Sequence, residues 1–156
     1  MSFEIRILGP GDDDVLTRVA EEVFDHAVNP SLAAEFLADP RHHLAVAIDR
    51  GMVVGFASGV HYIHPDKHAE LWINEVAVAP THRGIGVGRA VVEALLVAGR
   101  QAGCAEAWVL TDEDNVPALR LYRAAGGRRK ARPDIMFTFD LTGTARPGAL
   151  KRISRP

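Results

Sequence analysis

The chain contains the segment Arg83-Gly84-Ile85-Gly86-Val87-Gly88, which lies between a strand-like run, 71–78, and a helix-like run, 89–102. Glycine can take backbone conformations closed to other residues and lets a ligand approach the main chain. The free N–H groups of a first helical turn, aided by the helix dipole, attract anionic oxygens. The segment therefore predicts a diphosphate-binding turn between a strand and a helix, with the charge of Arg89 at its rim.

Glycine-rich turns of this kind also occur in P-loops and in dinucleotide-binding folds. No Gly-Lys-Ser or Gly-Lys-Thr follows the glycines, so the lysine and the magnesium-binding hydroxyl of a P-loop are missing. The turn also lies in the middle of the chain, without a first strand before it and an acidic residue about twenty positions on. Both of these readings are therefore disfavoured.

The segment resembles motif A of the GNAT N-acetyltransferases, whose pattern Arg/Gln-x-x-Gly-x-Gly/Ala matches Arg83, Gly86 and Gly88 after the strand 76–80. A second match resembles the family's later helix, in the order that the family has. It reads Asn115-x-x-Ala118-x-x-Leu121-Tyr122-x-x-x-Gly126. The resemblance implies an acetyl-CoA-dependent N-acetyltransferase that transfers the acetyl group directly, without a covalent enzyme intermediate.

Hydrophobic periodicity and turn residues predict the elements of the fold. Together with the resemblance they indicate an α/β (α+β) class: a mixed, mostly antiparallel twisted sheet of about six to seven strands, flanked by about four helices. A central parallel strand pair would surround the helix 89–102. The expected strands are 3–7, 44–48, 53–62, 71–78, 105–111 and 135–141, and the expected helices are 12–24, 31–37, 89–102 and the one starting at Asn115.

Composition limits the function classes. The 156 residues, 47% of them hydrophobic, suit one domain, expected over 1–141, with 142–156 as a flexible basic tail. A net charge of −2 gives no basic field for nucleic acid. We expect a cytoplasmic protein without membrane contact, because no apolar run is long enough for a span and the N-terminus lacks an apolar signal core. The single cysteine, Cys104, is better explained as a small packed residue than as a nucleophile.

Acetyl transfer to an amine needs a base for the ammonium and a proton donor for the departing thiolate. Glu75 is the candidate base, because strict alternation places it on one sheet face with Leu71 and Ile73, where apolar neighbours favour its proton-accepting role. The alternative is that a strand bulge turns Glu75 outward to pair with a surface cation. Tyr122 matches the family tyrosine near the CoA sulfur and is the candidate acid; the alternative is a core aromatic side chain.

The resemblance also assigns the residues that bind CoA. It implies that the main-chain N–H of Val76 holds the acetyl oxygen, that Val78 pairs with the pantetheine arm and that Asn115 contacts CoA. The resemblance assigns the diphosphate to the glycine segment, 83–88, and to Arg89 directly after it. The complete predicted set is Val76, Val78, Arg83, Gly84, Ile85, Gly86, Val87, Gly88, Arg89 and Asn115.

The acceptor is predicted from charge. Asp112, Glu113 and Asp114 lie before the helix of Tyr122 and would attract a polycationic small-molecule amine, although such a run can also complement a helix dipole. The stretch 37–141 is similar to GNAT-type aminoglycoside 3-N-acetyltransferases, which implies an aminoglycoside acceptor. A polyamine or a protein amine is the alternative, as is a CoA-binding module without catalysis. A homodimer is included among the predicted partners, and no metal is assigned, because the histidines lack a ligand spacing.

Overall fold

The structure is a computed structural model that describes residues 2–132 and 134–142. Its described part contains one five-stranded sheet with the strands in sequence order. The first three pairings are antiparallel and the last, between β4 and β5, is parallel. The strands are β1 (Glu4–Leu8), β2 (His42–Asp49), β3 (Met52–Tyr62), β4 (Glu70–Val78) and β5 (Glu106–Val109).

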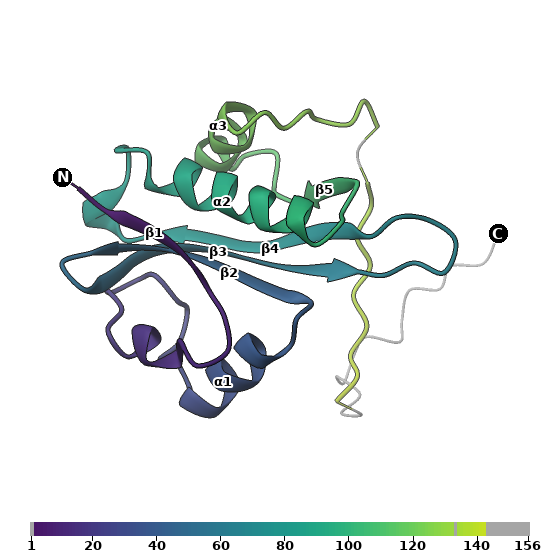
Figure 1. Cartoon of the computed structure of the whole chain (residues 1–156). Helices are drawn as coiled ribbons and strands as arrows, with labels where there is room; N and C mark the ends of the chain where they lie inside the picture. The colour runs from purple at the N-terminus through teal and green to yellow at the C-terminus, as the bar shows by residue number, and fades with distance from the viewer. Residues whose placement is uncertain (1, 133, 143–156) are drawn as a thin grey trace.

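Helices cover both faces of this sheet (Figure 1). On one face lie α2 (Val87–Gln101) and α3 (Val116–Ala124), and on the other lie α1 (Pro30–Ala38) and a short 3-10 helix, η1 (Asp13–Thr17). A second 3-10 helix, η2 (Pro80–His82), joins β4 to the glycine segment. The predicted order of a strand, a glycine turn, a helix and a parallel strand is confirmed, with α2 beginning two residues before the expected Arg89.

One layer of the core lies between α2 and the sheet. Val91, Val92 and Leu95 recur at helical spacing and are buried, as are Leu71 and Ile73 of β4. Glycines on the facing surfaces allow the close approach. A Cβ on Gly99 of α2 would lie 2.7 Å from Leu71 Cδ2, and one on Gly55 of β3 would lie 2.8 Å from Val87 Cγ1. The helix therefore sits directly on the strands, and its first residue is fixed against β3.

The predicted helix over 12–24 is wrong beyond η1. After that turn, the main chain of 18–20 bonds to β3 instead: Ala20 N–H donates to Val53 O at 2.9 Å, and Val53 N–H donates to Arg18 O at 2.8 Å. These hydrogen bonds replace helical ones, so Val23 and Phe24 reach the sheet from an irregular segment. The next helix, expected over 31–37, is confirmed as α1, and Asn29 Oδ1 caps it by accepting from Ser31 N–H at 2.9 Å.

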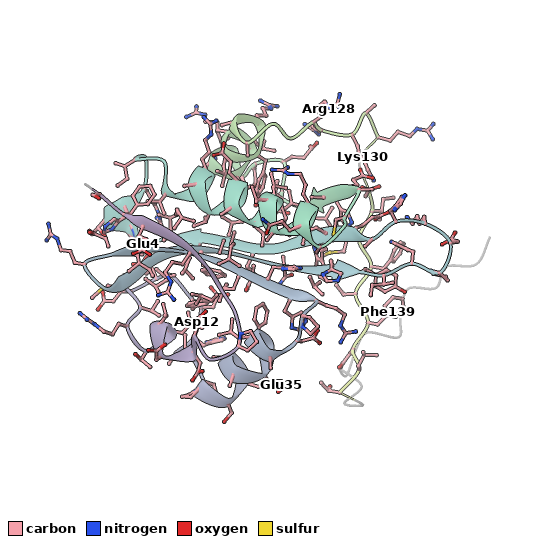
Figure 2. The ribbon with its side chains drawn as sticks, viewed as in Figure 1. Glu4, Asp12, Glu35, Arg128, Lys130 and Phe139 are labelled. Carbon is pink, nitrogen blue, oxygen red and sulfur yellow. The ribbon has the colours of Figure 1, made fainter. Side chains whose placement is uncertain are left out.

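The predicted strand over 135–141 is also wrong, since these residues form no ladder in the structure. In Figure 1 this stretch passes from the α3 side of the picture toward the α1 side, and Figure 2 labels Phe139 on it. The apolar side chains of this stretch are exposed. The alternation of its residues gives it one apolar face, but a strand also needs a neighbouring strand to pair with. The described residues thus give five strands and three α-helices, and the parallel pair lies at the sheet edge rather than its centre.

The basic tail expected from 142 lies outside the described residues, except for Thr142. Over the described part of the chain, none of the helices has both the length and the apolar character needed to cross a bilayer.

We expect Gly55→Ala to lower the free energy of unfolding by about 1–3 kcal/mol, because the new methyl group would overlap Val87 and lie 3.1 Å from Ala77 O. Urea denaturation measures the change. Gly9→Ala is the matched control, since a Cβ there has no atom within 4 Å. Equal stability of the two variants would contradict this account of how α2 is seated.

Candidate active site

A β-bulge in β4 determines which side chains face the site. Ser58 pairs with Glu75 and the next residue of β3, Gly59, pairs with Ile73, so Asn74 is the extra residue. Leu71 lies on the α2 face of the sheet, where it lines the space next to Gly99. The extra residue reverses the alternation that follows, and Glu75 therefore lies on the opposite face.

The prediction that Glu75 shares a face with Leu71 and Ile73 is thus wrong: Glu75 is exposed and lies on the opposite face of the sheet. It does not pair with a surface cation in the described structure either. Glu75 instead lines a cavity of about 240 Å³ on the face away from α2. The other lining residues are Val23, Phe24, Asp25, Phe56, Val76 and Ala77.

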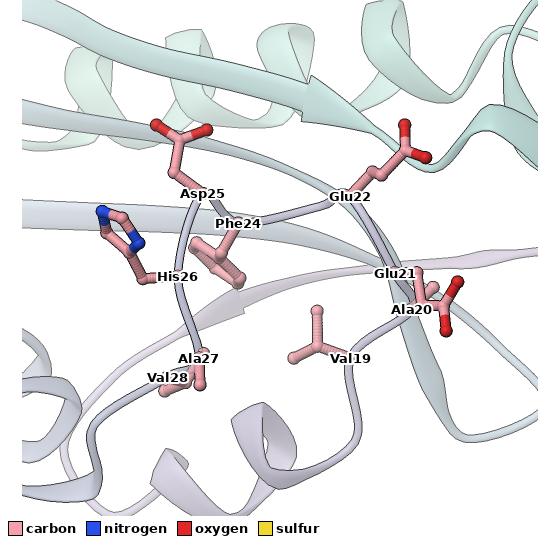
Figure 3. Close-up of a pocket in the computed structure, with 9 residues that line it drawn as sticks. All are labelled: Val19, Ala20, Glu21, Glu22, Phe24, Asp25, His26, Ala27 and Val28. Carbon is pink, nitrogen blue, oxygen red and sulfur yellow. The ribbon is translucent and has the colours of Figure 1, made fainter.

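A second cavity, of about 280 Å³, adjoins the first through Phe24 and Asp25. It is formed by the irregular segment 19–28, and Figure 3 shows Glu22 and Asp25 directed toward the sheet. Phe24 is stacked on Phe56 with ring centroids 4.2 Å apart, which gives the two cavities a common apolar wall. Sequence reasoning missed Glu21, Glu22 and Asp25 because it placed the first two on a helix and the third directly after it, although their acidic clustering was visible.

The edge of β4 next to β5 opens beyond the bulge. The pairing of the two parallel strands ends at Ile73 with Val109, whereas β4 continues to Val78. The final residues of β4 therefore have β3 on one side and no strand on the other, within the described chain. This opening lies at the carboxyl end of β4, where the chain enters η2 and the glycine segment.

The main-chain groups of Val76 and Val78 point into this opening. Ala79 N–H donates to Val54 O of β3 at 2.9 Å, and the register from Ala57–Val76 to Gly55–Val78 is unbroken. Because N–H directions alternate along a strand, Val78 and Val76 direct their N–H groups to the other edge. Arg83 Nε donates to Val78 O at 3.0 Å, as an outward carbonyl allows.

The glycine segment has the backbone that its sequence predicts. Gly84 and Gly86 have φ of 77° and 93°, and Gly86 precedes the first helical residue, Val87. The N–H groups of this first turn have no partners inside the helix. Gly88 also allows close packing, since a Cβ there would lie 3.4 Å from Leu121 Cδ2 of α3. The segment thus exposes a helix N-terminus next to the open edge of β4.

The polar residues predicted to surround CoA have protein partners. Arg89 Nε donates to Glu93 Oε1 at 2.7 Å, within α2, and Arg83 also lies 3.9 Å from Glu22. Asn115 Oδ1 caps α3 by accepting from Ala118 N–H at 3.2 Å.

Tyr122 lies on α3 and is half-buried against the core cluster. Burial raises the pKa of its phenol above the usual value. The hydroxyl therefore keeps its proton at neutral pH and can act as a donor. Burial likewise raises the pKa of the Cys104 thiol, which disfavours the thiolate that a nucleophile needs.

The acidic run 112–114 is exposed between β5 and α3. Glu113 forms an ion pair with Arg129, and the run is not among the residues that line the two cavities. Three of the histidines have partners of their own: His43 Nε2 lies 2.8 Å from His61 Nδ1, and His82 bonds to Asp49. The described residues contain no group of three or more His, Cys, Asp or Glu side chains arranged for a metal ion.

Residues 14–126 match the model of the acetyltransferase (GNAT) family. The chain belongs to this family. The matched region is an N-acetyltransferase domain, and it contains the bulge, the open strand edge and the glycine segment. The GNAT resemblance predicted from the two sequence motifs is confirmed.

Several known proteins are similar to this GNAT chain. Streptothricin acetyltransferase of Streptomyces lavendulae is 36% identical over 57% of this chain and 45% of its own length. Mycothiol acetyltransferase of Thermomonospora curvata is 33% identical over 85% of this chain and 46% of its own length. The chain thus spans about half the length of these curated relatives.

Among solved structures, an aminoglycoside acetyltransferase from an uncultured soil metagenomic sample, in complex with sisomicin, superimposes with a TM-score of 0.73. It is 18% identical, and the match covers 88% of this chain and 97% of the other. At this identity the likeness supports the fold of the GNAT chain.

We expect the phenol of Tyr122 to ionise above pH 10.0 in the folded protein, because burial disfavours the charged phenolate. The chain has two tyrosines, so Tyr62→Phe leaves Tyr122 alone to be titrated by ultraviolet absorbance. In denaturant its midpoint should fall to the ordinary value. A midpoint at or below the ordinary value in the folded protein would show that this hydroxyl is solvated.

Proposed function

We propose that this chain transfers an acetyl group directly from acetyl-CoA to a primary amine. The observation that carries the proposal is the outward direction of the Val76 and Val78 N–H groups at an open edge of β4, beside the N-terminus of α2. A strand edge of this kind can pair with the amide groups of a pantetheine arm, as it would with another strand. The helix N-terminus then lies where the diphosphate of the same molecule would follow.

The CoA-binding residues divide by chemistry. The N–H groups of residues 83–88 bind the diphosphate, with Gly84 and Gly86 providing the positive φ that turns the main chain toward it. Arg83 and Arg89 are exposed near this segment and add positive charge. Asn115, the residue that caps α3, contacts the CoA.

The reaction needs two protons removed from the acceptor nitrogen and one supplied to the CoA sulfur. Glu75 accepts the proton of the acceptor ammonium, directly or through water, and the neutral nitrogen attacks the thioester carbonyl carbon. The N–H of Val76 stabilises the oxyanion of the tetrahedral intermediate. The carbon–sulfur bond then breaks, the CoA thiolate takes a proton from the Tyr122 hydroxyl, and the phenolate regains a proton from the acetylated nitrogen, which still carries one more than the amide needs. The products are an amide and free CoA, and no metal is required for any of these steps.

The proposed acceptor is an aminoglycoside, with acetylation at its 3-amino group as the finer expectation. Its several ammonium groups suit the carboxylates on the cavity side of the sheet, where Glu75, Asp25 and Glu22 lie next to the stacked rings of Phe24 and Phe56. The run 112–114 is a second proposed acidic surface. The solved aminoglycoside acetyltransferase with bound sisomicin supports the choice through its fold.

A linear polyamine or a protein or peptide amine is the second candidate. One observation favours it: Glu75 is exposed, so the base is accessible to an extended chain as well as to a compact ring system.

We expect Glu75→Gln to lower kcat by about 10²–10⁴-fold, as the loss of an acid–base group typically does, while the affinity for CoA is retained. The loss should shrink at high pH, where more of the acceptor amine is already neutral. Thiol release measures the rate and calorimetry the affinity. Glu4→Gln, an exposed acid on β1, is the control. Full activity of Glu75→Gln at neutral pH would remove Glu75 from the mechanism.

The acceptor is tested with a gentamicin-type aminoglycoside, spermidine and a peptide with a free N-terminus, with thiol release as the readout. We expect the aminoglycoside to be acetylated fastest, with a KM that rises with salt, because exposed charges are screened over about 8 Å at physiological ionic strength. Asp25→Asn should raise its KM by about two- to fivefold, the factor for one exposed ion pair.

The double variant Asp112→Asn/Asp114→Asn separates the two acidic surfaces in the same assay. An effect confined to the double variant would place the acceptor at the 112–114 run. Faster acetylation of spermidine or of the peptide would move the enzyme to the second candidate, and product analysis by NMR identifies the modified amine.

A further inference from the structure

His82 connects two distant parts of the chain directly before the glycine segment. Its Nε2 lies 3.2 Å from Asp49 Oδ2, and the two side chains are only 13% and 18% exposed. Its Nδ1 lies 2.9 Å from Thr81 Oγ1. A carboxylate can only accept, so Nε2 carries the proton and donates it, and in the neutral ring Nδ1 accepts from the threonine hydroxyl. Both ring nitrogens are therefore engaged.

The two partners are held by different elements. Asp49 is the last residue of β2 and pairs with Met52 across the β2–β3 hairpin. His82 is the last residue of η2, and its own N–H donates to Ala79 O at 2.8 Å. The next residue, Arg83, begins the glycine segment. The bond thus fixes the end of a short 3-10 turn to the sheet, at the point where the chain turns toward α2.

We propose that His82 is a positioning residue for the CoA-binding segment, and that Asp49 holds His82 in place. This inference rests on the proposed function, because it assigns the diphosphate to residues 83–88. The physical need arises from Gly84 and Gly86: glycines lose more conformational freedom than other residues when a loop is ordered, and a ligand must then supply that free energy. A loop that is fixed at both ends, by His82 and by α2, loses less conformational freedom when the ligand binds.

This role predicts a particular kinetic pattern. The diphosphate is distant from the reacting carbonyl and is held equally before and during the reaction. Its binding therefore stabilises the bound substrate and the transition state by the same amount. Loss of the anchor should raise the KM for acetyl-CoA and the Kd for CoA, and leave kcat at saturation unchanged. A residue that only supports the fold would instead lower the amount of folded enzyme.

The test compares His82→Ala, Asp49→Ala and the double variant by calorimetry with CoA and by steady-state kinetics, with thermal unfolding as the check on folding. We expect each single variant to weaken CoA binding by about three- to tenfold, the factor for one net hydrogen bond. The double variant should be no weaker than either single one, because both changes remove the same bond. Asp49→Asn keeps an acceptor oxygen and should restore near-normal affinity.

Two controls make a negative result interpretable. His68→Ala removes an exposed loop histidine and should leave CoA affinity unchanged. Gly86→Val places a side chain at a φ of 93° and should weaken CoA binding strongly. If Gly86→Val weakens binding while folded His82→Ala and Asp49→Ala do not, the positioning role is wrong. If Gly86→Val also binds CoA normally, the proposed CoA segment itself is wrong. A fall in kcat without a change in KM would likewise overturn the proposal.

Discussion

The extra residue at Asn74 is the constraint on which the site depends. Before it, β4 directs Leu71 and Ile73 toward α2 and the core; after it, Glu75 and Ala77 face the opposite cavity. A regular strand could not do both, because its side chains alternate with a period of two. The pairing with β5 also ends at Ile73, next to the bulge. One inserted residue therefore coincides with both the exposure of the carboxylate and the opening of the strand edge.

The close packing of α2 on the sheet is the second requirement, and glycines in both the helix and the strands allow it. Gly55 and Gly59 of β3 and Gly99 of α2 each leave space that a methyl group would fill. The helix can therefore approach the sheet closely and start next to the end of β4. The proposed diphosphate site and the proposed acetyl site then lie at successive positions along one direction, from the open edge of β4 to the N-terminus of α2.

Sequence patterns predicted the elements whose own residues contain the cause of their structure. The strands β1 to β5 and the helix α2 have periodic apolar residues and clear turn signals, and each forms close to where it was expected. The segment after η1 differs because main-chain bonds to Val53 compete with helical ones. The stretch 135–141 differs because a strand also needs a neighbour, which the alternation of its own side chains does not supply.

The sequence by itself determined the family, the glycine segment with its helix and the identity of the two candidate acid–base residues. These depend on local spacing, and local spacing is what a motif records. Only the tertiary structure determined that Glu75 faces the cavity, and that Val76 and Val78 direct their N–H groups to a free edge. It also brought Asp25 to the cavity that Glu75 lines. Each of these depends on the register between strands that are distant in the chain, and register is set by packing across the whole sheet.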